Sequence, residues 1–377
     1  MIPSQRHLFE LPDDVAYLNC AYFSPLMKTV IEAGRRAVNY RARPWEITSR
    51  DFFTTSDSTR SLFARLINVR PDDVAIVPSV SYGIAIAARN LPVARGQTIV
   101  LLDEQFPSNV YAWHEAAKRA GAEIMTVPRP RDGDWTAATL SAITERSAVA
   151  ALPNCHWTDG GLLDLSRIAP HCQQLGVPLV LDLAQSAGAL PFDAARVQPD
   201  FAVAPSYKWL MGPYSLAFLY VAPKWQAGEP LEHNWIAREA SEDFADLVMY
   251  RDRFQPGARR FDMGERANFQ LLPMAEAAMC QLLEWGVPQI ADTLAHRTAA
   301  IVKRAQALGL TSAPNKLRAG HFLGLRFPDG VPVGLMDKLS AERVCVSVRG
   351  DSMRVTPHVY NTPADVDRLF SVLTAVL

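Results

Sequence analysis

Two ionisable residues interrupt apolar segments in the middle of the chain. Lys208 stands between Tyr207 and Trp209, directly after the apolar run FAVA, and Asp182 lies inside the segment VPLVLDLAQS. A carboxylate in so apolar a strand is costly unless a buried cation or several hydrogen-bond donors face it. A lysine in a dry pocket has a lowered pKa, and its neutral amine is a nucleophile. A structural ion pair, or two unrelated charges at the rim of a sheet, would explain the same residue types.

Pyridoxal phosphate (PLP) is one cofactor that accounts for both residues. It offers an aldehyde to the lysine, a cationic ring nitrogen to the aspartate and a phosphate to the start of a helix. The segment VPSVSYGIAIAA can supply that helix start, because Ser79 and Ser81 follow an apolar strand and precede a helical pattern. Simple capping of the helix by a serine explains this segment as well. Neither GxGxxG nor GxxxxGK[ST] occurs, so the sequence lacks the motifs that best indicate binding of a dinucleotide or a nucleoside triphosphate.

The elements around these residues alternate between strands and helices. Short apolar runs predict strands, and patterns with apolar residues every three or four positions predict helices between them. The expected strands are 73–77, 98–103, 122–127, 147–153, 177–183 and 200–205, and the expected helices are 82–91, 109–121, 135–143 and 163–176. Near-continuous apolar strands with crossover helices indicate an α/β domain with a largely parallel sheet covered on both faces. Ligands of such sheets bind outside the carboxyl ends of the strands, where Asp182 and Lys208 lie.

The last third of the chain has a different pattern. Long helical segments at 274–286 and 289–309 precede strand-like segments at 321–328 and 344–349 and a final helix at 362–373. We therefore expect a large domain at 46–260 and a smaller α+β domain at 261–377, with an N-terminal segment, 1–45, packed on the smaller domain.

Composition excludes several classes of protein. The formal net charge of −1 across 377 residues argues against a nucleic-acid-binding protein. We find neither a signal peptide nor 18 uninterrupted apolar residues, and expect a soluble, cytoplasmic protein without a membrane partner. The five cysteines form no CxxC, so we expect neither a metal site nor a disulfide framework.

The ordered set HWTDGGLLDL, GVPLVLDLAQSAGALPFD and PDFAVAPSYKWLMGP resembles the class V aminotransferases. These are fold type I PLP-dependent enzymes, among them the cysteine desulfurases and kynureninases, and the resemblance extends from AYLNCAYFSPL to YNTPADVDRL. It implies a mostly parallel seven-stranded sheet between helices in the large domain, together with the smaller α+β C-terminal domain.

The resemblance also implies roles for individual residues at the cofactor. Lys208 would form the Schiff base with PLP and then move the proton at the substrate α-carbon, and Asp182 would keep the ring nitrogen protonated. The remaining cofactor contacts that it implies are Gln185 at the ring hydroxyl, Phe106 on the ring face, Ser81 and the Val80 backbone at the phosphate, and Ser206, Tyr207 and Thr158 nearby.

Three further residues are assigned to an amino acid substrate in the same way. Arg354, in SMRVTPHVYNT, would form a two-pronged salt bridge with the α-carboxylate. Trp157 would line the same pocket, and Asn19 would reach the substrate. Without the resemblance, a surface arginine is an equally good interpretation of Arg354.

Two departures from family patterns narrow the expected function. The segment VRGDSMR before Arg354 contains no cysteine, and Cys345 lies within the strand-like VCVSV, which argues against a cysteine desulfurase. Many relatives place a Gly-Thr pair at a dimer interface, whereas here Glu265 follows Gly264. The resemblance implies a homodimer but leaves this contact to the cofactor phosphate open, with Arg266 or Asn268 as substitutes.

Transamination of a small or medium amino acid is the reaction that we expect first. The alternatives are a kynureninase-like hydrolase, which SYKWL and RVTPHVYNT favour and the shorter chain weakens, and an amino-acid lyase or epimerase. A protein that binds PLP without turnover would not need both Lys208 and Arg354.

Overall fold

A seven-stranded sheet forms the centre of the computed structural model, which describes residues 1–377. From edge to edge its strands are β2 (Val74–Val77), β8 (Ala217–Val221), β7 (Phe201–Pro205), β6 (Leu179–Asp182), β5 (Ser147–Pro153), β3 (Thr98–Leu102) and β4 (Glu123–Val127). Only β8 runs antiparallel to its neighbours. The predicted α/β architecture with a mostly parallel sheet is confirmed.

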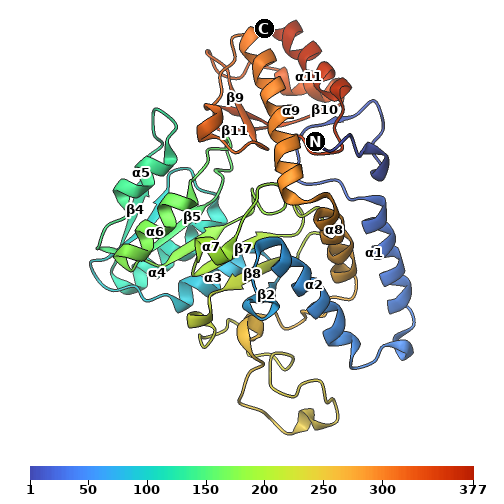
Figure 1. Ribbon diagram of the computed structural model, residues 1–377, viewed down its shortest axis with the longest axis vertical. Helices are drawn as coiled ribbons and strands as arrows, with labels where there is room; N and C mark the ends of the chain where they lie inside the picture. Colours follow the sequence, from blue (N-terminus) through green and yellow to red (C-terminus); the bar gives the residue numbers. More distant parts are fainter.

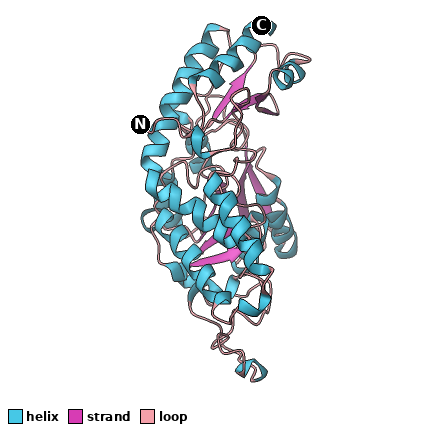
Figure 2. Cartoon of the chain, turned by 90° about the vertical axis from the view of Figure 1, so that its right-hand side faces the viewer, coloured by secondary structure: helices cyan, strands magenta, loops and turns pink.

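Helices cover both faces of this sheet (Figures 1 and 2). One buried cluster unites the sheet with α3 (Val80–Asn90) and α4 (Tyr111–Ala120), and a larger one unites it with α2 (Asp51–Ile67), α6 (Leu165–Leu175) and α8 (Leu271–Trp285). All residues of the inner strands are consequently buried, which explains their unbroken apolar sequences. The edge strand β4 is largely open to solvent on one side.

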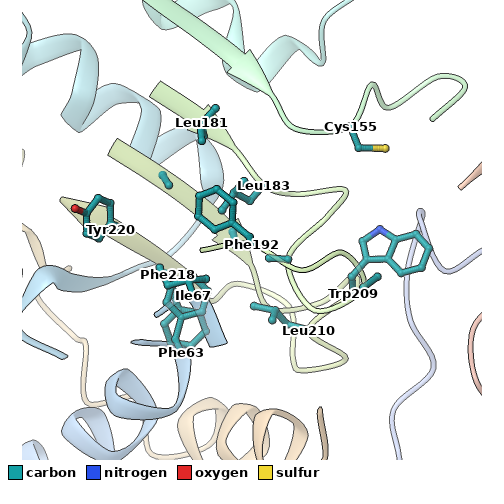
Figure 3. Packing of buried hydrophobic residues seen from close by; sticks show 14 of the residues in the cluster. Phe63, Ile67, Cys155, Leu181, Leu183, Phe192, Trp209, Leu210, Phe218 and Tyr220 are labelled. Carbon is teal, nitrogen blue, oxygen red and sulfur yellow. The ribbon is translucent and has the colours of Figure 1, made fainter. Parts of the chain in front are cut away.

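The larger cluster also fixes the orientation of Asp182. Leu181 and Leu183 lie in this cluster, as Figure 3 shows, where Phe63 of α2 stacks on Phe218 of β8 at 4.8 Å between ring centroids. Successive side chains of a strand point to opposite faces, so Asp182 points toward the α3 face of the sheet.

The C-terminal part begins with the long helix α9 (Val287–Ala307) and contains a separate antiparallel sheet. Its strand order is β11 (Ser347–Arg349), β12 (Ser352–Val355) and β9 (Leu323–Arg326), flanked by α10 (Leu335–Ala341) and α11 (Pro363–Val376). The N-terminal strand β1 (Ala16–Tyr17) pairs with β10 (Val344–Cys345). Figure 1 shows the N-terminus close to this part of the molecule, while α1 (Lys28–Arg41) descends beside α8.

The predicted elements agree with the structure in type and order, with two short helices, α5 (Trp135–Ala142) and α7 (Ala194–Val197), completing the large sheet's surroundings. The elements beyond the expected set are strands β1 and β8 and helices α1, α2, α7 and α10. A segment around 228–256 contains little regular structure and projects from the body at the bottom of Figure 1. None of the helices combines the length and apolar character needed to cross a lipid bilayer.

Candidate functional site

The fold brings Asp182 and Lys208 to one cavity of about 240 Å³. Asp182 is the last residue of β6 and pairs with Val203 of the adjacent β7, and Lys208 follows three residues after the end of β7. Both side chains therefore project from the carboxyl ends of neighbouring parallel strands. Of the residues singled out in the sequence, the cavity is lined by Ser79, Val80, Ser81, Phe106, Asp182, Tyr207 and Lys208.

Lys208 and Asp182 are both buried without an ionic partner in the chain. Lys208 is 7% exposed and Asp182 is 6% exposed, and neither forms a salt bridge. Burial lowers the pKa of Lys208 to about 8, against the opposing effect of Asp182, while Arg354 and Arg349 lower it further. Burial raises the pKa of Asp182, whose carboxylate accepts one hydrogen bond, from the Ala184 N–H at 2.9 Å.

The start of α3 forms the wall of the cavity that suits a phosphate. Ser79 caps this helix by accepting a hydrogen bond from the Tyr82 N–H, and its hydroxyl lies 2.9 Å from that of Ser81. Ser108 and Ser215 add hydroxyl groups to the same wall region. A helix N-terminus surrounded by hydroxyl groups favours an anion.

Aromatic side chains border the cavity on other sides. The Phe106 ring centroid lies 5.4 Å from Lys208 Nζ, and the ring meets Trp157 edge to face at 5.2 Å. Tyr207 packs between Tyr214 at 4.7 Å and Phe23 at 4.8 Å. Phe106 is thus able to cover a flat group held between Asp182 and Lys208.

A smaller adjoining cavity shares Phe106, Asp182 and Lys208 and is also lined by Gln185 and Trp157. The Gln185 amide oxygen accepts a hydrogen bond from Trp209 Nε1 at 2.9 Å, and its Nε2 donates to the Ala21 carbonyl at 3.2 Å. The second N–H of the amide has no partner within the chain, which leaves one donor for a ligand.

Arg354 lies beside this cavity with no carboxylate partner. Its Nε and Nη2 donate to the Ser347 hydroxyl at 2.9 and 2.7 Å, and its Nη1 donates to the Trp157 carbonyl at 3.1 Å. The Ser347 hydroxyl in turn donates to Asn19 Oδ1 at 3.0 Å. Burial lowers the pKa of Arg354 to about 10. Because these bonds use three of five N–H donors, two donors remain for a carboxylate.

Like Arg354 and Asn19, the expected residues Thr158 and Ser206 line neither cavity. The Thr158 hydroxyl accepts from Arg129 Nη2 at 2.8 Å and lies 2.8 Å from His156 Nδ1. Ser206 is buried, and its hydroxyl is directed at Gly212, where a side chain would collide with it.

The segment after Gly264 also differs from the possibilities left open by the sequence. Arg266 is fully buried and pairs with Asp262, which Arg60 contacts at 2.9 Å. This arginine is therefore committed to the core of its own chain and cannot extend to a partner, whereas Asn268 lines a surface cavity with Glu265.

Some residues at the site were not singled out from the sequence. Ser108, Tyr214 and Ser215 line the main cavity, and Ser347 and Arg349 accompany Arg354. The position of Ser108, two residues after Phe106, is the one signal that could have indicated it, because both follow the end of β3.

Comparisons with known proteins place this geometry among related chains. Residues 17–369 match the family described as Aminotransferase class-V. The uncharacterized aminotransferase YcbU of Bacillus subtilis is 28% identical, with 89% of this chain and 86% of the relative covered. Isopenicillin N epimerase of Streptomyces clavuligerus is 27% identical, with 97% and 96% covered. A kynureninase of Deinococcus radiodurans is 28% identical over 69% of this chain and 64% of the relative.

Solved structures show the same fold. A cysteine desulfurase from Thermococcus onnurineus NA1 superimposes with a TM-score of 0.86 at 19% identity, with 100% of this chain and 99% of the other covered. A C-DES variant with glycine covalently linked to its PLP cofactor superimposes with a TM-score of 0.87 at 19% identity, with 99% and 100% covered. The predicted fold type I architecture is thereby confirmed.

Proposed function

This chain belongs to the class V aminotransferase family of PLP-dependent enzymes, and from that premise we propose that it transaminates an amino acid at the cavity between Asp182 and Lys208. The observation that carries the proposal is the pair of buried, unpaired ionisable groups in one cavity, with Arg354, which has no carboxylate partner, beside the smaller adjoining cavity. An ion-pair role would bring the two groups to salt-bridge distance. Their separation fits a group held between them.

The residues of the cavity fit PLP. Asp182 would face the ring nitrogen, Phe106 would cover the ring, Gln185 would donate to the ring hydroxyl, and the start of α3 with Ser81 would hold the phosphate. When bound, PLP supplies an aldehyde for covalent attachment of amines and an electron sink for the α-carbon. Tyr207 would complete the wall beside the phosphate, and Ser206 and Thr158 would support the cavity from behind.

Lys208 is the base in this proposal. With its pKa lowered to about 8, a substantial fraction of the amine is neutral near pH 7.5, so it can take the proton from the substrate α-carbon and return it. Arg354 would hold the α-carboxylate with its two remaining donors, oriented by Ser347 and Asn19. Trp157 fixes the other side of the guanidinium through its carbonyl.

The titratable groups around the cavities favour transamination over epimerisation by two bases. Apart from Asp182 and Lys208, the chain contributes only Tyr207, Tyr214 and Cys155 to the two linings. Burial raises the pKa of the Cys155 thiol and raises the pKa of Tyr207 to about 12. Both groups therefore stay protonated near neutral pH, and neither is suited to act as the second base that a two-base epimerisation needs.

The hairpin before Arg354 supports the exclusion of desulfurase chemistry. Arg349 pairs with Ser352, so only Gly350 and Asp351 connect β11 to β12. Such a tight turn offers no mobile loop for a sulfur-accepting cysteine, and Cys345 lies in β10 with a raised pKa. The likeness to a solved desulfurase concerns the fold.

The experiment is a half-reaction with a panel of amino acids and cofactor-loaded protein. Transamination predicts conversion of the cofactor to its amine form with release of one equivalent of keto acid. Exchange of the α-proton with inversion of the α-carbon, and no release of keto acid, would show that the reaction is epimerisation and not transamination. Release of anthranilate from kynurenine would favour the hydrolase, for which the Deinococcus radiodurans relative is the supporting comparison. If the cofactor-loaded protein responds to no amino acid, the result would favour a protein that binds PLP without turnover.

We also propose a cytoplasmic homodimer. The projecting segment 228–256 carries Val248, Met249 and Tyr250, which are 76%, 60% and 96% exposed, and Trp45 is 77% exposed. A run of exposed apolar side chains such as that from Val248 to Tyr250 is typical of an interface. Light scattering of the purified protein tests the dimer, and a monomer at micromolar concentration would contradict it; cell fractionation tests the location.

A further inference from the structure

A second arginine, Arg349, shares a face of the C-terminal sheet with Arg354. Ser347 lies opposite Arg354 in the β11–β12 ladder, and its hydroxyl accepts from the Arg354 guanidinium. Arg349 is two residues after Ser347 on the same strand, so its side chain leaves the sheet on the same side. Both guanidinium groups lie near the Trp157 ring, with distances from Cζ to the ring centroid of 5.8 Å for Arg349 and 5.9 Å for Arg354.

Arg349 has no anionic partner in the chain. It forms no salt bridge, and its side chain donates one hydrogen bond, to the adjacent Val348 carbonyl. The nearest acid in the sequence, Asp351, pairs instead at 3.2 Å with Arg326 of β9, the strand on the opposite flank of β12 from β11.

The other acids of this region are also engaged. Asp159 pairs with Arg326 at 3.0 Å and with Arg129, and Glu104 pairs with Arg129 at 2.6 Å. The local carboxylates are thus matched to Arg129 and Arg326, and Arg349 and Arg354 are left with an uncompensated positive charge next to the cavity.

A second observation places Arg349 within electrostatic reach of the reaction centre. It lowers the pKa of Lys208 together with Arg354, and it also lowers the pKa of Arg354. A half-buried arginine near a lysine and another arginine is unfavourable unless an anion joins them. One α-carboxylate can occupy the free donors of Arg354, and Arg349 then remains for another anion.

We infer that Arg349 binds a second acidic group on the substrate, so that the enzyme prefers amino acids whose side chains end in a carboxylate or a similar anion. This inference rests on the proposed function, because it assigns the α-carboxylate to Arg354 and the α-carbon to the Lys208 cavity. Trp157 would pack along the aliphatic part of the side chain, between the two charged ends.

L-glutamate and L-glutamine are the probes, since they have nearly the same shape and differ in the charge of the side chain. Titration of cofactor-loaded protein, followed by cofactor absorbance, gives a Kd for each. We expect glutamate to bind more tightly than glutamine, so that Kd for glutamine divided by Kd for glutamate is well above one. We expect Arg349→Gln to reduce this ratio by about 10- to 100-fold, the range of one charge-assisted pair. Arg349→Lys should retain part of the preference, because it keeps the charge and loses the planar fork.

Arg343→Gln is the matched control. This exposed arginine on the neighbouring β10 flank pairs with Asp14, away from the cavity, so its replacement removes the same charge without changing the ratio. Calorimetric titration of cofactor-free protein with glutarate provides a readout that needs no chemistry. Its affinity should fall in Arg349→Gln and not in Arg343→Gln.

The outcomes separate the two proposals. Protein that takes up no PLP contradicts the proposed function. Protein that loads PLP and responds to amino acids, but has the same glutamate-to-glutamine ratio before and after Arg349→Gln, overturns this inference alone. Loss of self-association in Arg349→Gln with an unchanged ratio would also overturn it, since the arginine would then serve a subunit interface.

Discussion

In cofactor-free protein, the Lys208 amine should lose its proton near pH 8. Burial lowers its pKa to about 8, whereas an ordinary lysine titrates near 10.4. At pH 7.5 about a quarter of the Lys208 side chains would then be neutral, compared with about one in a thousand for an ordinary lysine. Competitive labelling with an amine-specific reagent across pH 6 to about 11, read by mass spectrometry of the Lys208 peptide, measures this midpoint. The exposed Lys303 serves as a reference in the same digest.

The same shift predicts an effect on stability. Between about pH 8 and pH 10.4 the unfolded state binds the proton that the folded state has released, so the free energy of unfolding rises with pH in this window. Below pH 8 the buried Lys208 ammonium lowers the free energy of unfolding by its full amount, about 3 kcal/mol. Lys208→Met removes the buried ammonium. It should stabilise cofactor-free protein by about this amount at pH 7, and the gain should vanish by about pH 10.5.

Two results would contradict a lowered pKa of Lys208. One is a labelling midpoint at Lys208 of about 10 or higher, which would mean that the side chain is solvated. The other is a Lys208→Met variant that is no more stable than the parent in urea at pH 7. Arg354→Gln tests the cause, since loss of a neighbouring cation should move the Lys208 midpoint upward.

The remaining predictions concern the substrate clamp, the core and acid stability. Arg354→Gln should raise the Kd for amino acids about 10- to 100-fold while cofactor uptake persists, as measured by absorbance titration, and equal loss of PLP affinity would contradict this role. Asp262→Ala leaves two buried arginines without their partner and should cost about 3–5 kcal/mol in urea unfolding, and a loss below about 1 kcal/mol would show that water reaches the cluster. Burial lowers the pKa of His321 to about 4 and that of His358 to about 3, so the unfolded state alone takes up their protons as pH falls below about 6.5. The free energy of unfolding should fall by about 1 kcal/mol per pH unit for each histidine between pH 6 and pH 4. His358→Phe should remove the contribution of one histidine from this slope, and an unchanged slope would contradict the lowered pKa of His358.

The large sheet could be predicted because its strands are buried on both faces. Unbroken apolar runs such as 147–153 and 201–205 have few other stable environments, and the crossover helices between them indicate parallel order. Strand β8 was not predicted, although residues 217–221 are as apolar as the others. It follows the lysine loop without a crossover helix, so the alternating pattern that identified its neighbours is interrupted there.

The site was predictable to the extent that chemistry follows strand ends. Asp182 ends β6 and Lys208 follows three residues after the neighbouring β7, and their residue types alone indicate an unusual environment. Thr158 shows the limit, because its sequence neighbour Trp157 lines a cavity while the threonine itself faces Arg129. The free charge of Arg349 could not be predicted, since it depends on Asp351 pairing with Arg326, 25 residues away in the sequence. The domain limits at 45/46 and 260/261 stay a prediction.

Borohydride reduction of the loaded protein, followed by peptide mapping, would identify the lysine that attaches PLP covalently. If Lys208 is that residue, in a cavity where Asp182 faces the ring, we predict one pyridoxyl group per chain on the peptide that contains Lys208 and no stable incorporation in Lys208→Ala. Stoichiometric incorporation at another lysine, or unchanged labelling of Lys208→Ala, would show that Lys208 is not the attachment site.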